Sequence, residues 1–214
     1  MQKNLINISD YYNSENITYE LIDVRSPYEY SIDHIPGALN FPALNNLERA
    51  EVGKIYNQNS FEAKKIGAAL ICKNIAVYLE NTWKDKPKSW LPVIYCWRGG
   101  NRSKSVSHVL EKIGWKVLVL DGGYKAYRKY VLNCIPEYVN NLTLSVVCGL
   151  TGSGKTKFLD YLKSKKEQVL DLEGLALHRG SLLGGIPSIN QPSQKMFDSL
   201  LLNKLKSFEV NRKI

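Results

Sequence analysis

The sequence is poor in the residues and patterns that mark several classes of protein. Its four cysteines, Cys72, Cys96, Cys134 and Cys148, are far apart and form no C-x-x-C pair. This spacing argues against a disulfide framework or a cysteine-rich zinc site, and it favours free thiols in a reducing cytosol. No apolar run is long enough to span a bilayer, and residues 1–20 lack the charged start, apolar middle and cleavage site of a secretory signal. We therefore expect a cytoplasmic protein with no membrane partner.

Charge is the compositional feature with a functional meaning. The chain has 214 residues, is 44% hydrophobic and 23% charged, and carries a formal net charge of +9. A hydrophobic fraction of this size can bury a core. The positive excess attracts polyanions such as nucleic acid, and it serves equally well as ordinary solubility charge.

Strands alternate with helices in the first two thirds of the chain. Apolar segments at residues 19–25, 90–96 and 115–123 have the length and flanking turn residues of buried strands. This alternation predicts an α/β fold with a parallel sheet, in which a site lies beyond the carboxyl ends of the strands. Helical segments are expected at 43–57, 60–85, 102–114 and 124–135.

A domain boundary is expected at the stretch PEYVNN, which divides the chain into domains 1–136 and 137–214. The second domain should contain two strands, each followed by a helix or a loop. Its expected elements are a strand over 142–150, a helix over 155–166, a strand over 167–174 and a helix over 195–208.

The stretch YCWRGGNRSKS places a lone thiol in a turn between a strand and a helix, and Cys96 and Arg102 frame a C-x5-R pattern. The glycines of this turn allow several backbone N–H groups to point inward, and the start of the following helix adds positive potential. Surroundings of this kind lower the pKa of a thiol from about 8.5 to roughly 3.5–7.5. We expect Cys96 to be a nucleophile, and the other three cysteines to be buried and structural. The expected anion cradle consists of Arg98, Gly99, Gly100 and Arg102.

Two chemistries fit such a loop, and the residues leave both open. C-x5-R is the pattern of cysteine phosphatases, and a similar cradle carries the persulfide of rhodanese-like sulfurtransferases. The upstream stretch LIDVRSPYEYSIDHIPGALNFP resembles the rhodanese pattern in its Asp23–Arg25 segment, Glu29 and the HIPGA segment. One class of phosphatases shares this signature, so it predicts the fold better than the reaction. Tyr95 stands where phosphatases usually have histidine, which counts against a phosphatase.

The stretch GLTGSGKT matches the complete phosphate-binding pattern G-x4-G-K-[ST]. It follows an apolar segment and precedes a helical one, which is the context that this motif requires. Lys155 would reach the terminal phosphates, and Thr156 would be a ligand of Mg²⁺. The expected phosphate-binding residues are Gly149, Thr151, Gly152, Ser153, Gly154, Lys155 and Thr156.

Five stretches together, CWRGGNRSKS, LDGGYKAYRKYV, GLTGSGKT, VLDLEGLALHRGS and QPSQKMF, resemble the tRNA 2-selenouridine synthases. The resemblance covers nearly the whole chain and implies a rhodanese-like parallel-sheet domain followed by a P-loop NTPase-like α/β domain. It implies a transferase that geranylates wobble 2-thiouridine in tRNA with geranyl diphosphate. The enzyme would then exchange the geranylthio group for selenium from selenophosphate. The family's catalytic cysteine matches Cys96. We expect no tightly bound cofactor, because geranyl diphosphate and selenophosphate are substrates, and Mg²⁺ is expected only at Thr156.

Four polar residues of the second domain are weaker candidates. Asp171 and Glu173 lie at the end of a predicted strand, and they fit a role with Mg²⁺ or substrate as well as a strand-end or helix-cap role. His178 and Arg179 follow in a loop, where they are candidates for anion or RNA contacts.

The second domain has fewer strands than a P-loop fold requires. Such a fold has about five parallel strands, and two are predicted after residue 141. We therefore expect this domain to be partial and its remainder to come from further sequence or from a partner polypeptide. An inactive fragment and a non-catalytic sulfur carrier are the alternatives to a working enzyme.

Overall fold

The chain forms two structural units. The computed structural model describes residues 4–14, 17–150, 152–180, 184–187, 189–209 and 214. Its contacts separate Met1–Tyr130 from Val131–Ile214, and each unit is described by itself. This division falls inside the helix Gly123–Asn140. The predicted domain boundary near residue 136 therefore stays a prediction.

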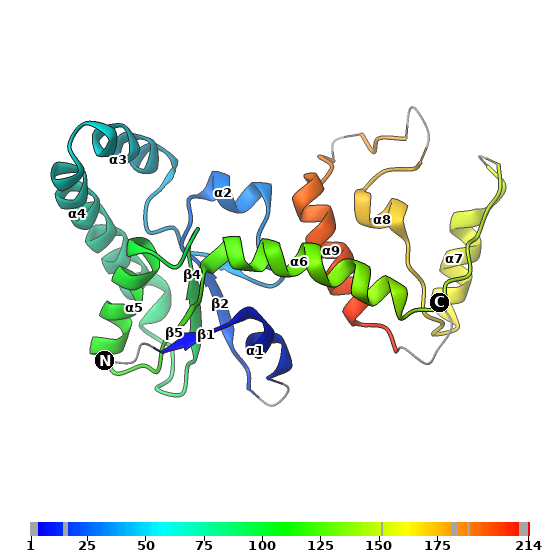
Figure 1. Cartoon of the computed structure of the whole chain (residues 1–214), viewed down its shortest axis with the longest axis horizontal. Coiled ribbons are helices and arrows are strands. Elements are labelled where there is room, and N and C mark those ends of the chain that lie inside the picture. Colours follow the sequence, from blue (N-terminus) through cyan, green and yellow to red (C-terminus); the bar gives the residue numbers. More distant parts are fainter. Residues whose placement is uncertain (1–3, 15–16, 151, 181–183, 188, 210–213) are drawn as a thin grey trace. The chain divides into compact units, whose positions relative to one another are not determined.

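A five-stranded parallel sheet organises the first unit (Figure 1). The strand order is β1-β5-β4-β2-β3, and every neighbouring pair is parallel. The predicted parallel α/β sheet is therefore confirmed. The short edge strands β1 and β3 were not predicted, because two-residue strands have no periodicity to read. The strands are β1 (Leu5–Ile6), β2 (Glu20–Asp23), β3 (Leu39–Asn40), β4 (Pro92–Tyr95) and β5 (Leu118–Leu120).

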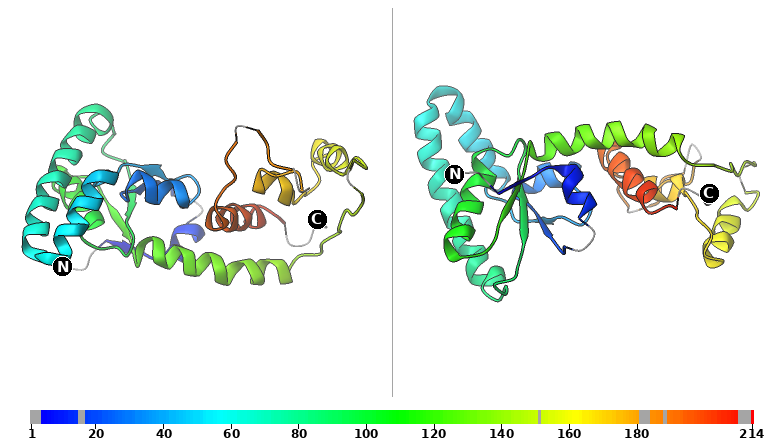
Figure 2. Two further views of the ribbon diagram at one scale, coloured as in Figure 1. Left: turned by 90° about the horizontal axis from the view of Figure 1, so that it is seen from above. Right: turned by 60° about the horizontal axis from the view of Figure 1, so that its bottom comes forward.

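Helices cover both faces of this sheet: α4 and α5 lie on one face, and α1, α2 and the start of α6 lie on the other (Figure 1, Figure 2). The buried residues of α4 recur every fourth position from Ala63 to Ile75, so they form one stripe that packs inward. The predicted helix over 60–85 ends as a regular helix at Tyr78 and continues as a π-helical segment, η1. The bounds are α1 (Ile8–Asn13), α2 (Pro27–Ile32), α3 (Asn46–Gln58), α4 (Ser60–Tyr78), η1 (Leu79–Trp83), α5 (Asn101–Ile113) and α6 (Gly123–Asn140).

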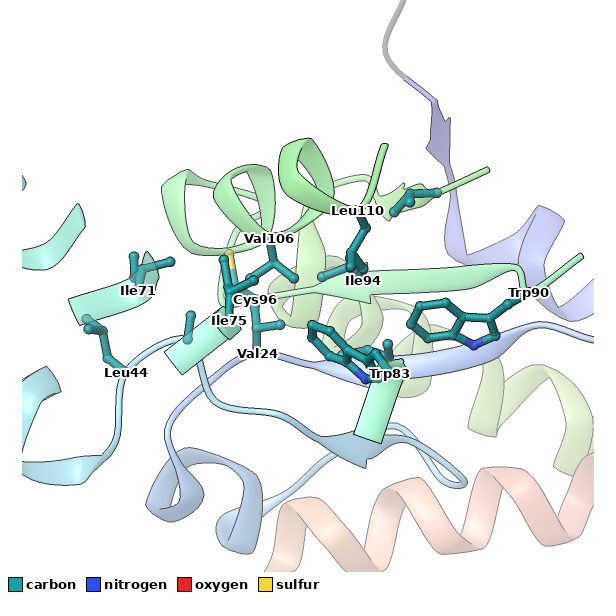
Figure 3. Packing of buried hydrophobic residues seen from close by; sticks show 13 residues of the cluster. Val24, Leu44, Ile71, Ile75, Trp83, Trp90, Ile94, Cys96, Val106 and Leu110 are labelled. Carbon is teal, nitrogen blue, oxygen red and sulfur yellow. The ribbon is translucent and has the colours of Figure 1, made fainter. Parts of the chain in front are cut away.

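The main hydrophobic core lies between the sheet and the α4–α5 face (Figure 3). Alternate residues of a strand point to opposite faces, and Ile94 and Cys96 point into this core. Trp83, which is fully buried, and Trp90 fill the end of the core near the start of β4. The core therefore fixes the strand that leads directly into the cysteine loop.

A buried ionic network occupies the opposite face of the sheet. The Arg25 guanidinium donates to both carboxylate oxygens of Asp23 at 2.6–3.1 Å and to the carbonyl oxygen of Asp33 at 2.7 Å. Its carbon lies 3.9 Å from the ring centre of Tyr124, whose hydroxyl donates to the Asp33 carboxylate at 2.8 Å. The four side chains are buried, so the network ties β2, the segment after α2 and the first turn of α6 together.

Tyr95, the residue before Cys96, belongs to this network face. It is fully buried, and its hydroxyl accepts a hydrogen bond from the Ile35 N–H at 3.2 Å. Successive strand residues point to opposite faces, so Tyr95 points away from the cysteine loop and has a structural role.

The second unit contains the expected helices but not the expected strands. α7 (Lys155–Ser164), α8 (Leu172–Ala176) and α9 (Gln194–Lys206) form, and α7 and α9 match the predictions. The strand predictions over 142–150 and 167–174 are wrong for this structure, because the described residues there form no strand. A parallel strand needs a neighbouring strand to pair with its N–H and C=O groups. In the described part of the chain, residues 143–145 form two backbone hydrogen bonds, both with Ile214.

Helix α6 corrects a second prediction. It was expected to end at residue 135, yet it continues through Pro136 to Asn140. Proline removes one helical hydrogen bond and crowds the preceding turn, but Pro136 lies on the exposed side of the helix. The helix is held instead by the buried side chains of Val131 and Cys134 on its other side.

Two of the remaining cysteines are not buried, contrary to expectation. Cys72 and Cys148 are exposed, whereas Cys134 is buried as predicted. Cys72 is next to Ile71, which belongs to the inward stripe of α4, so Cys72 itself faces outward. Cys148 lies in the strandless segment before α7.

No helix in the described part of the chain has the length and apolarity needed to cross a membrane.

Arg25→Met should lower the free energy of unfolding of the first unit by about 3–5 kcal/mol, because it leaves the Asp23 carboxylate buried without its partner. Tryptophan fluorescence during urea unfolding measures this unit selectively, since all four tryptophans precede residue 131. The matched control is Lys65→Met, which breaks the exposed Lys65–Glu62 pair and should cost less than about 1 kcal/mol. Equal losses for the two variants would contradict a stabilising role for the buried network.

Candidate functional site

The sulfur of Cys96 lies in a cradle of hydrogen-bond donors at the carboxyl end of β4. Cys96 is 3% exposed. Its Sγ accepts a hydrogen bond from the Gly100 N–H at 3.2 Å and lies 3.2 Å from the Ser103 hydroxyl oxygen. The loop leads directly into α5, whose first residue is Asn101, and the start of a helix carries positive potential. The Ser103 hydroxyl also donates to the Gly100 carbonyl oxygen at 3.1 Å, so the Gly100 N–H is the defined donor to the sulfur. The role of Cys96 as a nucleophile stays a prediction.

The start of α6 fixes the backbone of the cysteine loop. The Tyr124 N–H donates to the Cys96 carbonyl oxygen at 2.9 Å, and the Lys125 N–H donates to the Trp97 carbonyl oxygen at 3.0 Å. Gly123 has a positive φ of 57°, and a Cβ at this residue would clash with the Cys96 carbonyl oxygen and approach the Gly99 nitrogen to 2.6 Å. Gly123 was not among the predicted site residues, although the paired glycines after a strand were a signal for it.

The two arginines of the predicted cradle have different roles. Arg102 donates to both carboxylate oxygens of Glu29, at 2.6 and 3.2 Å, so its charge is compensated and it ties the loop to α2. Burial would raise the pKa of Glu29, but the bonds and charges of Arg102, Ser26 and Arg49 outweigh it and lower the pKa. Arg98 is exposed and, within the described part of the chain, has no ion-pair partner, so it is the cradle cation left for a ligand.

A cavity of about 690 Å³ opens above Cys96. Its volume is within the range of roughly 300–1,000 Å³ that is usual for ligand sites. The loop contributes Trp97 and Arg98, among other residues, and α3 contributes one wall that includes Arg49 and Tyr56. The sequence predicted α3 as a helix but gave no signal that this helix faces the cysteine loop.

The predicted phosphate loop precedes α7 in the second unit. Gly152 and Gly154 have positive φ values of 81° and 85°, the left-handed conformation that glycine permits. Lys155, the first residue of α7, donates to the carbonyl oxygens of Gly149 and Leu150 at 2.8 and 3.0 Å. The loop therefore offers a helix N-terminus and a lysine for an anion.

Three other residues of the predicted loop complete its description. Ser153 and Thr156 are exposed, which leaves the Thr156 hydroxyl accessible to a metal ion. Thr151 lies outside the described residues. The binding of Mg²⁺ at Thr156 stays a prediction.

An apolar cavity of about 440 Å³ adjoins this loop. Lys155 and Thr156 line it together with apolar side chains that include Val146, Leu162 and Val169. The second unit thus places the glycine loop beside an apolar cavity.

The weaker candidates have structural contacts. Asp171 accepts the Gly174 N–H at 2.9 Å as the N-cap of α8, and it accepts a hydrogen bond from Lys163 at 2.9 Å. Burial raises the pKa of Asp171, but the Lys163 and Gly174 bonds outweigh it and lower the pKa. Asp171 is therefore the N-cap of α8, and a role of Asp171 with Mg²⁺ stays a prediction.

Glu173, His178 and Arg179 lie close together in the chain after this cap. The His178 N–H donates to the Glu173 carbonyl oxygen at 3.0 Å, and the Arg179 N–H donates to the Gly184 carbonyl oxygen at 2.8 Å. The Glu173 and Arg179 side chains are exposed and accessible to a ligand. The role of Glu173 with Mg²⁺ or substrate remains a prediction, and so do the anion or RNA contacts of His178 and Arg179.

Comparison with protein families matches the two units separately. Residues 8–130 match the rhodanese-like domain, so the chain belongs to the rhodanese-like family. Residues 142–213 match the tRNA 2-selenouridine synthase AAA domain. The expected combination of a rhodanese-like and a P-loop domain is thus confirmed.

Relatives that are similar over most of this chain are named tRNA 2-selenouridine synthase. Identity is 38% with the Nitrosomonas europaea enzyme and 40% with the Bdellovibrio bacteriovorus enzyme, over 89% and 88% of this chain. The chain spans about half the length of these curated relatives, 50% in both cases. A crystal structure of an N-terminal domain from Clostridium difficile 630 has 37% identity and a TM-score of 0.52, and the match covers 60% of this chain and 98% of that one.

Gly123→Ala should destabilise the first unit by roughly 2–4 kcal/mol, because it combines a backbone clash with a left-handed conformation. It should also change the rate at which iodoacetamide alkylates Cys96. Gly100→Ala is the control, since a Cβ there meets no atom within 4 Å, and it should cost less than about 1 kcal/mol. Unfolding followed by tryptophan fluorescence measures both, and a neutral Gly123→Ala would contradict the tight packing of the loop.

The Glu29–Arg102 pair should stabilise the first unit at neutral pH but not in acid. A carboxyl group whose pKa is lowered by folding stabilises the protein above its unfolded pKa of about 4.3 and loses this effect as the pH falls through the folded pKa. Urea unfolding should therefore show a difference between wild type and Glu29→Gln that is constant above about pH 5 and shrinks toward pH 3. A difference that stays the same down to pH 3 would show that the carboxylate charge contributes nothing.

Proposed function

We propose that this chain carries the chemistry of a tRNA 2-selenouridine synthase, converting wobble 2-thiouridine in tRNA to 2-selenouridine through a geranylated intermediate. The observation that carries the proposal is the presence of two anion cradles of different kinds. One holds the Cys96 sulfur at hydrogen-bond distance from the Gly100 N–H, and the other adjoins an apolar cavity. The relatives named tRNA 2-selenouridine synthase support the substrate. A tRNA substrate agrees with the net charge of +9 and with the expected cytoplasmic location.

Geranylation uses the second unit in this proposal. The diphosphate of geranyl diphosphate binds the glycine loop and Lys155, and its hydrocarbon chain enters the apolar cavity. The sulfur of 2-thiouridine attacks the first carbon of the geranyl chain, a carbon–sulfur bond forms, and the carbon–oxygen bond to diphosphate breaks. Mg²⁺ held at Thr156 would neutralise charge on the diphosphate. The remainder of a P-loop domain comes from further sequence or a partner polypeptide.

Selenium transfer uses Cys96. Its thiolate attacks C2 of the base, and the geranylthio group leaves as a thiolate. The selenium of selenophosphate then displaces the cysteine sulfur from C2, which regenerates the thiolate. Water cleaves the phosphorus–selenium bond and releases phosphate, leaving 2-selenouridine. Arg98 is the cation available to hold selenophosphate at this loop.

Cys96→Ala should abolish selenium transfer and leave geranylation intact, because the sulfur serves only the second step. Mass spectrometry of nucleosides, after incubation with thiolated tRNA, geranyl diphosphate and selenophosphate, measures both products. Accumulated geranylated nucleoside without selenouridine is the expected result. Normal selenouridine formation by the variant would overturn the role of Cys96.

Lys155→Ala should slow geranylation and weaken diphosphate binding, because it removes the lysine charge from the phosphate loop. The neighbouring Lys157→Ala is the matched control, since Lys157 does not line the apolar cavity. Geranylation by Lys155→Ala at the wild-type rate would show that the diphosphate binds elsewhere.

A cysteine phosphatase is the second candidate, because Cys96 and Arg102 retain the C-x5-R spacing. Two observations weigh against it: Glu29 compensates the charge of Arg102, and a buried tyrosine precedes the cysteine. Strong phosphate release from a generic phosphatase substrate, lost in Cys96→Ser, would favour the phosphatase over the synthase.

A further inference from the structure

The cavity above Cys96 is larger than the anion cradle at its base. The cradle itself is formed by loop atoms such as the Gly100 N–H, 3.2 Å from the sulfur. The cavity has a volume of about 690 Å³ and extends to α3. A tetrahedral anion needs only the cradle, so the remaining space fits a ligand of nucleoside size.

The lining of this cavity has the chemistry that recognises a base. Tyr56 on α3 is 53% exposed, and Trp97 in the cysteine loop is 39% exposed. Bases of single-stranded RNA stack on aromatic side chains, and Asn57 in the same lining can bond to the edge of a base. Arg49 in this lining adds positive charge for a flanking phosphate.

One of the two aromatic rings is fixed before a ligand arrives. The Trp97 ring centre lies 5.2 Å from that of Tyr124, and the Tyr124 hydroxyl bonds to Asp33 at 2.8 Å. Arg25 lies against the Tyr124 ring, 3.9 Å from its centre. The buried network therefore supports the position of Trp97 and reduces the entropy that Trp97 loses on binding.

We propose that this cavity is a nucleoside pocket in which the base to be modified stacks on Tyr56 and Trp97 above the Cys96 sulfur. The proposal rests on the proposed function for the identity of the base. Cys96 is 3% exposed, so the reacting carbon reaches it only if the nucleotide turns out of the RNA stack into the cavity. Arg49 on α3 then binds a phosphate next to the turned-out nucleotide, while Arg98 stays available for selenophosphate.

Equilibrium binding of an anticodon stem-loop RNA tests the pocket without turnover. One labelled RNA carries 2-thiouridine at the wobble position, and a second RNA is identical but abasic there. Fluorescence anisotropy with the full chain should show that loss of the base weakens binding by roughly 5- to 150-fold, the range for one stacked base.

Variants assign this preference to the aromatic rings. Tyr56→Ala should bind the thiolated RNA more weakly and the abasic RNA as wild type does, while Tyr56→Phe keeps the preference because it keeps the ring. Phe61→Ala is the control, since Phe61 on α4 is 66% exposed and does not line the cavity. It should behave as wild type with both RNAs. Tryptophan fluorescence during unfolding checks that each variant is folded.

The outcomes separate this inference from the proposed function. Equal wild-type affinity for the two RNAs overturns the pocket, whatever the nucleoside assay shows. An undiminished base preference in both Tyr56→Ala and Trp97→Ala also overturns it. A preference that Tyr56→Ala removes, in a chain that forms no selenouridine, supports the pocket and counts against the proposed reaction.

Discussion

The Arg25–Asp23 ion pair is the interaction on which the architecture of the first unit depends. Both groups are almost completely buried, and a charge in such a place persists only with a matched partner and further hydrogen bonds. The Arg25 guanidinium also donates to the Asp33 carbonyl oxygen and lies against the Tyr124 ring. The segments that carry these groups come from β2, the turn after α2 and the first turn of α6. Satisfying one buried guanidinium therefore fixes three separate parts of the chain.

The cysteine loop depends on that network through the start of α6. Once Tyr124 is held by Asp33, its backbone N–H meets the Cys96 carbonyl oxygen. Gly123 allows the close approach because any side chain would meet the loop backbone. The loop glycines then direct the Gly100 N–H to the sulfur. The position of the Cys96 thiol thus depends on packing on the opposite face of the sheet.

The two units differ in how their strands are satisfied. In the first unit β4 has a partner on each side and is fully buried, so its apolar sequence is compatible with its surroundings. In the second unit the apolar residues before α7 remain exposed, Val146 by 80% and Leu150 by 85%. The same apolar pattern gives a strand only where neighbours complete its hydrogen bonds. The phosphate loop still forms its left-handed glycines and helix N-terminus, because those features are local.

The sequence by itself determined the features that depend on neighbouring residues. These are the parallel α/β class, the strands leading to Cys96, the glycine conformations before Lys155 and the helix that follows them. Each is readable because periodicity, turn residues and motif spacing act over a few positions.

Only the tertiary structure decided which distant residues meet. It paired Arg102 with Glu29, leaving Arg98 as the exposed cation. It placed Gly123 against the cysteine loop and put Tyr56 of α3 into the cavity above the sulfur. It also left the two predicted strands of the second unit unformed. These outcomes depend on contacts between segments far apart in the chain, and a local pattern carries no information about such contacts.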